Sequence, residues 1–108
     1  MSSNKLTIDN LEKLFSELIV ILEVNEKGNI DYQISEVIYV IKLLNQCIDN
    51  NYIEADSVIN EIKLNFSNLY PPRGGLSDFF IWKADFAERV KANEPLGRIG
   101  DELWKMLK

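Results

Sequence analysis

Residues 69–85 read Leu-Tyr-Pro-Pro-Arg-Gly-Gly-Leu-Ser-Asp-Phe-Phe-Ile-Trp-Lys-Ala-Asp, and this stretch separates two helical parts of the chain. The pair Pro71-Pro72 ends the helix before it, because proline lacks the amide donor and clashes with the preceding turn. Gly74-Gly75 then allows a backbone turn that a side chain would forbid. The apolar segment Phe79-Phe80-Ile81-Trp82 is expected to form a helical turn packed on the core, with an edge strand as the alternative.

Three amphipathic helices are predicted before this stretch, at about residues 8–24, 31–49 and 52–67. In each, apolar residues recur at intervals of three and four, which lines one face of a helix. The residues expected to face inward are Leu11, Leu14, Phe15, Leu18, Ile19 and Leu22, then Ile34, Val37, Ile38, Ile41, Leu44 and Ile48, then Tyr52, Ala55, Val58, Ile59, Ile62 and Phe66. Short connections between these helices imply antiparallel neighbours.

The ends of the first two helices carry capping signals. Asp9 and Glu12 have the spacing of a capping box, which predicts a helix start near residue 9. Gly28 can adopt the left-handed conformation of a C-terminal turn. Asn29 or Asp31 is expected to cap the second helix.

Two further helices are predicted after the stretch, at about residues 84–92 and 95–107. Asp85 and Glu88 repeat the capping spacing, and Pro95 is tolerated at a first helical position. The expected inward residues are Phe86 and Val90 in the fourth helix, and Leu96, Ile99, Leu103, Trp104 and Leu107 in the fifth. The predicted fold is all-α: a single-domain antiparallel bundle of about five helices, residues 1–108, with an irregular Pro/Gly loop between the third and fourth.

Charge is unevenly distributed along the chain. Its 108 residues suit one domain, and hydrophobic and charged contents of 46% and 27% are typical of globular proteins. Residues 1–68 hold eleven acidic and five basic side chains, whereas residues 69–108 hold six and seven. The net charge of -5 therefore arises in the first part of the chain. Such an acidic domain repels nucleic acid and anionic membranes and favours a basic partner.

The residue types argue against catalysis, cofactors and metals. The chain has no His and one Cys, so it contains no zinc or transition-metal spacing and lacks the usual base for a nucleophile. Glu54 and Asp56 fit the first positions of a calcium loop, but the required glycine and terminal glutamate are absent. Cys47 is expected to be a small buried residue on a helix. We therefore expect no enzymatic activity, no catalytic residues and no cofactor or metal site.

The N-terminus lacks the apolar core of a signal peptide. The longest apolar run, residues 18–22, is far shorter than the roughly 20 residues that span a membrane. The expected location is the cytoplasm.

Two groups of residues are candidates for binding a protein partner. One is an acidic face on and before the third helix, and the other lies on or beside the irregular loop, where aromatic residues and arginine commonly anchor interfaces. The candidates are Asp49, Glu54, Asp56 and Glu61 in the acidic group, and Tyr70, Arg73 and Trp82 in the loop group.

The C-terminal part also carries a family resemblance. Its residues are Tyr70-Pro-Pro-Arg-Gly-Gly-Leu-Ser-Asp-Phe-Phe-Ile-Trp82, Asp85-Phe86, Glu88-Arg89, Asn93-Glu-Pro-Leu96 and Glu102-Leu-Trp104. This pattern resembles a family of small bacterial all-helical proteins that are similar to immunity proteins of polymorphic or contact-dependent toxin systems. The resemblance implies a protein that binds a toxin domain with a basic surface stoichiometrically and blocks its active site. The alternative is a non-catalytic regulatory or adaptor module.

Overall fold

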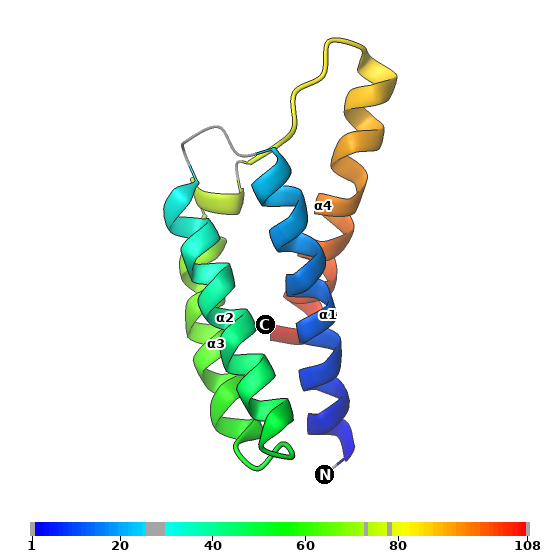
Figure 1. Cartoon of the computed structure of the whole chain (residues 1–108). Helices are drawn as coiled ribbons and strands as arrows, with labels where there is room; N and C mark the ends of the chain where they lie inside the picture. Colours follow the sequence, from blue (N-terminus) through cyan, green and yellow to red (C-terminus); the bar gives the residue numbers. More distant parts are fainter. Residues whose placement is uncertain (1, 26–29, 73, 78, 108) are drawn as a thin grey trace.

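The computed structural model describes residues 2–25, 30–72, 74–77 and 79–107, and these residues form four α-helices and one 3₁₀-helix (Figure 1). The elements are α1 (Ser2–Val24), α2 (Asp31–Asp49), α3 (Ala55–Leu69), η1 (Gly75–Ser77) and α4 (Phe86–Leu107). Successive helices run up and down the long axis of a molecule that measures 47 × 24 × 23 Å. The all-α class is confirmed, but the prediction of five helices is wrong by one.

Helix α1 lies at the centre of the packing. It contacts α2, α3 and α4, and the side chains it contributes to the core recur at helical spacing. Its buried residues are Ile8, Leu11, Leu14, Phe15, Leu18 and Leu22. The stripe expected for the first helix is therefore confirmed, except that Ile19 is only partly buried and Ile8 extends the stripe upstream.

The start of α1 differs from the prediction. The helix begins at Ser2, so Asp9 and Glu12 lie inside it and do not cap it. The burial of Ile8 extends the apolar stripe by one turn toward the N-terminus, which places the first buried residue before Asp9. Asp9 instead accepts a hydrogen bond from the Tyr52 hydroxyl at 2.6 Å, which ties α1 to the connection between α2 and α3.

Helix α2 has the predicted bounds, and of the residues expected to face inward Val37 and Leu44 are buried and Ile34, Ile41 and Ile48 are partly buried against the core. Its buried residues are Val37, Val40, Leu44 and Cys47. Ile38, expected to face inward, is exposed. Asp31 is the first helical residue and not the cap, since Ile30 holds the capping position without a side-chain hydrogen bond. Gly28 and Asn29 lie outside the described residues.

Helix α3 starts three residues later than predicted. Asn51 and Tyr52 have φ angles of 60° and 64°, which are left-handed and incompatible with an α-helix running through them. The Tyr52 amide donates to the Cys47 carbonyl at 2.8 Å, so this turn closes the end of α2 before α3 begins.

The two C-terminal helices are one. Helix α4 is continuous through Pro95, and the predicted break between residues 92 and 95 is wrong. A proline inside a helix costs about 3 kcal/mol, partly through the hydrogen bond it cannot donate to the residue four before it. That residue is Lys91, which is exposed, so water can satisfy its carbonyl. The start of α4 follows the predicted signal, because the Glu88 amide donates to Asp85 Oδ2 at 2.9 Å.

The irregular stretch turns at its glycines. Gly75 has φ of 56°, and a Cβ there would lie 2.8 Å from the Leu69 carbonyl oxygen, so a larger residue would not fit. The helical turn falls at η1, where Leu76 is buried, and not at Phe79–Trp82 as expected. The described residues 79–83 form neither a helix nor the alternative edge strand.

Among the described residues, no helix has both the length and the apolar character needed to cross a membrane.

Replacing the buried residue at the centre of α1 tests this packing. Phe15 is fully buried, so Phe15→Ala should lower the free energy of unfolding by about 3–5 kcal/mol. Val20, on the same helix, is 59% exposed, and Val20→Ala should change it by no more than about 0.5 kcal/mol. Urea denaturation followed by circular dichroism measures both, and equal losses would contradict the assigned core.

Candidate protein-binding surfaces

The predicted acidic residues are all exposed, but they do not form one face. Glu54, directly before α3, and Glu61, within α3, line the same shallow hollow of about 230 Å³ between α2 and α3. Asp56 lines a different hollow, and its carboxylate accepts a hydrogen bond from the Asn4 side chain of α1. Asp49 is exposed at the last residue of α2. The structure therefore brings together Glu54 and Glu61 and separates Asp56 from them.

Tyr39 joins these carboxylates on the surface of α2. Its hydroxyl donates a hydrogen bond to the Glu61 carboxylate, which together with desolvation and the nearby Glu36 raises the pKa of Tyr39. We call Glu36, Tyr39, Glu54 and Glu61 the acidic face. Tyr39 is not among the binding residues predicted from the sequence.

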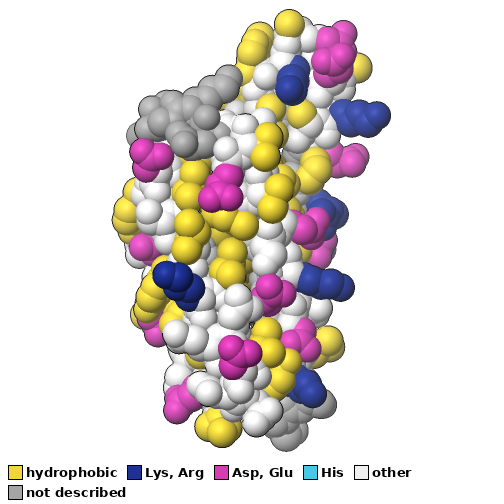
Figure 2. Space-filling model, viewed as in Figure 1, with side chains coloured by type: hydrophobic (Ala, Val, Ile, Leu, Met, Phe, Trp, Pro, Cys, Tyr) yellow, Lys and Arg dark blue, Asp and Glu magenta, His cyan; other side chains and the backbone are white. Residues whose placement is uncertain are grey.

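The acidic face lies on the most negative part of the described chain. Residues 30–70 hold six acidic and two basic side chains, whereas residues 79–107 hold five of each. In Figure 2 the side of the molecule formed by α2 and α3 shows mainly Asp and Glu among its charged side chains. None of the four predicted carboxylates, those of Asp49, Glu54, Asp56 and Glu61, forms an ion pair with a described Lys or Arg.

Cys47 lies beneath this face. Its thiol is buried on α2, as predicted, and burial followed by the charge of Glu54 raises its pKa. A thiol of this kind is a weak nucleophile at neutral pH. Across the described residues, no three His, Cys, Asp or Glu side chains gather in a way that would hold a metal ion.

The loop candidates are dispersed. Tyr70 is half-buried with its ring 5.0 Å from that of Phe66, and burial raises its pKa to about 12. Trp82 is exposed, and the guanidinium of Arg89 lies 4.2 Å from its ring centroid. Arg73 lies outside the described residues. Arg89, which sequence reasoning did not single out, is thus the arginine seen beside the aromatic side chains.

Hydrogen bonds of the Asn93 side chain connect residues 79–83 to α4. Its Oδ1 accepts from the Ile81 amide at 2.7 Å, and its Nδ2 donates to the Ile81 carbonyl at 2.8 Å. The Nδ2 also donates to the Arg89 carbonyl within α4 at 2.8 Å. Asn93 therefore satisfies both backbone groups of Ile81, as a neighbouring strand would.

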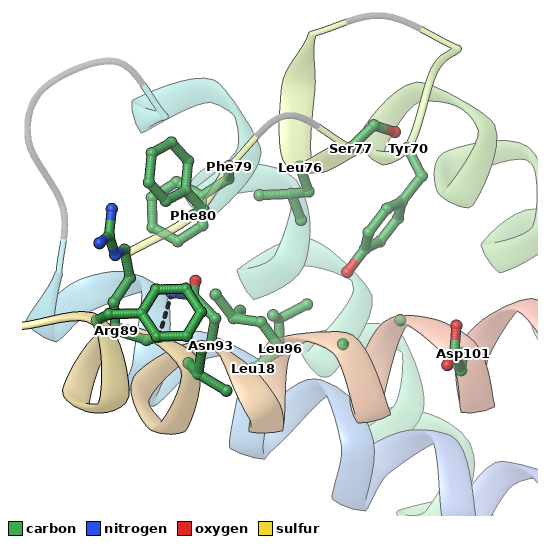
Figure 3. A pocket seen from close by; sticks show the side chains of 14 residues that line it. Leu18, Tyr70, Leu76, Ser77, Phe79, Phe80, Arg89, Asn93, Leu96 and Asp101 are labelled. Carbon is green, nitrogen blue, oxygen red and sulfur yellow. Dashed lines mark hydrogen bonds between the residues drawn. The ribbon is translucent and has the colours of Figure 1, made fainter. Parts of the chain in front are cut away.

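A pocket of about 720 Å³ lies between this segment and α4 (Figure 3). Most of its lining is apolar, and Phe80, Phe86 and Val90 are 60%, 72% and 55% exposed. The apolar lining residues are Leu18, Tyr70, Leu76, Phe79, Phe80, Phe86, Val90 and Leu96.

The prediction that Phe86, Val90 and Trp104 face inward is wrong, because these residues are 72%, 55% and 51% exposed. In one continuous helix these three residues share a stripe that differs from the buried one of Ile99 and Leu103. The first turns of α4 also extend beyond the end of α1, so α1 does not cover them (Figure 1).

Comparisons of the chain with protein-family models, with curated proteins and with solved structures find no match. The resemblance to immunity proteins stays a prediction from the C-terminal residues.

Removing the Asn93 side chain tests whether its hydrogen bonds hold residues 79–83 against α4. Asn93→Ala leaves the part-buried amide and carbonyl of Ile81 without partners, which should cost about 1–3 kcal/mol of unfolding free energy. Hydrogen exchange at the Ile81 amide should also accelerate. Asn60→Ala, at an exposed position of α3, is the matched control. An unchanged exchange rate at Ile81 in Asn93→Ala would show that the segment is held by other contacts.

The raised pKa of Tyr70 predicts a loss of stability at alkaline pH. Its folded pKa of about 12 lies above the ordinary tyrosine value near 10. Above pH 10 the unfolded chain releases this proton while the folded chain keeps it, so the free energy of unfolding falls as the pH rises toward 12. Urea titrations should show a smaller fall in Tyr70→Phe than in the wild type. Tyr32→Phe, at an exposed tyrosine, should behave like the wild type, and equal curves for all three proteins would refute the assignment.

Proposed function

We propose that this protein is a bacterial, cytoplasmic immunity protein that binds a toxin domain stoichiometrically through the acidic face and blocks its active site without catalysis. The observation that supports this most is the pairing of Glu54 and Glu61 around one hollow, with Tyr39 beside them. The two carboxylates are exposed and have no described cationic partner.

This arrangement suits a basic partner. Carboxylates that are not engaged in ion pairs keep their full field, which steers a positively charged surface into contact and raises the association rate. Toxins that act on nucleic acids need a basic substrate cleft, and an acidic face competes with the substrate for it. Tyr39 adds a rigid aromatic ring, a residue type enriched among interface hot spots.

Co-expression tests the proposal. The chain is produced together with the product of the adjacent open reading frame, and growth and co-purification are measured. The proposal predicts that this product alone inhibits growth, that co-expression restores it, and that the two proteins purify in equal amounts. Co-purification with a product that does not inhibit growth would favour the regulatory or adaptor role, and the absence of a complex would refute the proposal for this pair.

Charge reversal locates the binding surface. Glu54→Lys combined with Glu61→Lys should slow association with that product by about tenfold or more at low salt, because the steering field is reversed. Glu23→Lys combined with Glu88→Lys makes the same change in net charge at exposed sites on α1 and α4. This control should alter the rate by no more than about threefold. Stopped-flow association at several salt concentrations measures both, and equal slowing would place the contact elsewhere.

A further inference from the structure

The pocket between residues 79–83 and α4 has a charge at each end. Figure 3 shows Arg89 at one end and Asp101 at the other, with Asn93 and Leu96 between them. Neither Arg89 nor Asp101 forms an ion pair with a described residue. The described salt bridges of α4 belong to Arg98, which pairs with Glu17 and Glu102.

Aromatic contacts hold the Arg89 side chain in place, but its hydrogen-bond donors are not all paired. Its guanidinium carbon lies 4.2 Å from the ring centroid of Trp82 and 5.6 Å from that of Phe86. Its buried Nε has no hydrogen-bond partner among the described residues. Contact with aromatic rings holds a cation, but it does not replace the hydrogen bonds that a carboxylate would accept. Arg89 is therefore an oriented cation at the end of an apolar pocket, and its guanidinium has a hydrogen-bond donor without a partner in the described part of the chain.

The floor of the pocket is open to close approach. Gly97 and Gly100 line it from α4, and a Cβ at Gly97 would meet no atom within 4 Å. At Gly100 the nearest atom to such a Cβ is Tyr70 Cε1, at 3.9 Å. A slender apolar chain can lie on this backbone surface, covered by the aromatic side chains of the opposite wall.

The separation of Arg89 and Asp101 along the axis of α4 limits the length of the occupant. Arg89 and Asp101 are twelve residues apart on α4, and twelve residues of α-helix rise about 18 Å. With bonds of about 1.5 Å and angles near 111°, an extended saturated chain advances about 1.25 Å per bond, so a twelve-carbon chain of about 14 Å fits within this length. The pocket volume of about 720 Å³ also lies in the range of small-ligand sites.

We propose that this pocket binds a free medium-chain fatty acid, with the carboxylate on Arg89 and the tail running over Gly97 toward Asp101. The charge at each end determines the orientation, because Arg89 attracts a carboxylate whereas Asp101 repels it. The tail lies among Phe80, Val90 and Leu96, which removes their exposed apolar surface from water. This site is separate from the acidic face on α2 and α3, so its test is independent of the proposed function.

Isothermal titration calorimetry of the full-length chain with three ligands of equal chain length tests the proposal. Dodecanoate, below its micelle concentration, should bind with a dissociation constant in the micromolar range. Dodecyltrimethylammonium has the same tail with the opposite charge and should bind at least about tenfold more weakly. Dodecanedioate brings a second carboxylate toward Asp101 and should also bind at least about tenfold more weakly. Equal binding of all three ligands would show unspecific apolar adsorption and contradict recognition of the carboxylate. Absence of dodecanoate binding would overturn the proposal.

Variants separate the roles of the residues. Arg89→Gln should weaken dodecanoate binding by about tenfold to a hundredfold, because charge-assisted hydrogen bonds are lost, whereas Arg89→Lys should retain most of it. Asp101→Asn should improve dodecanedioate binding and leave dodecanoate binding unchanged. Arg98→Gln removes another arginine of α4 outside the pocket and is the matched control. Circular dichroism verifies that each variant is folded, and a loss in Arg98→Gln equal to that in Arg89→Gln would refute the assignment.

Discussion

The structure depends on the packing of α1 against the three other helices. A stripe of fully buried residues that includes Leu11, Phe15 and Leu18 contacts α2, α3 and α4, so a change in this stripe affects every helix interface that α1 makes. The length of this stripe also determines how far the core extends along α4. Leu18 is already part of the pocket lining, and beyond the end of α1 the first turns of α4 have no helix to cover them. The exposed apolar side chains of α4 are therefore a consequence of where α1 ends.

Two surfaces with different chemistry follow from this arrangement. The hairpin of α2 and α3 turns its carboxylates and Tyr39 to solvent on one side. On another side, α4 and residues 79–83 enclose an apolar pocket with Arg89 at its end, and Asn93 holds its two walls together. Burial of the α1 stripe stabilises both surfaces, and of this stripe only Leu18 lines the pocket, which fits a scaffold that positions binding groups.

Much of the fold could be predicted from local sequence rules, and the errors have identifiable causes. The bounds of α2, the burial of Cys47 and the capping by Asp85 follow from periodicity and side-chain chemistry alone. Pro95 has the local features of a helix start, and local rules cannot show that α4 continues through it; the buried residues of this helix, Ile99, Leu103 and Leu107, all follow the proline. The periodicity of α4 contains two apolar stripes, and only tertiary contacts decide which of them is buried.

The candidate sites were less predictable, since they depend on contacts between distant positions. The pairing of Tyr39 with Glu61 spans 22 residues, and that of Asn93 with Ile81 spans 12. Glu54 and Glu61 are seven residues apart, which is two helical turns and the same side of α3, whereas Asp56 is two residues from Glu54 and lies on the other side. Arg89 contacts Phe86 through the helical spacing of three residues within α4, but it contacts Trp82 only because residues 79–83 fold back along this helix.

The central claim is that the acidic face is the surface that contacts a protein partner. Hydrogen–deuterium exchange of the chain, alone and in complex with the product of the adjacent open reading frame, tests it most directly. The account predicts slower exchange in the complex within residues 36–61, which carry the acidic face, and unchanged exchange within residues 86–104. Protection confined to residues 79–104, with residues 36–61 unchanged, would contradict the account.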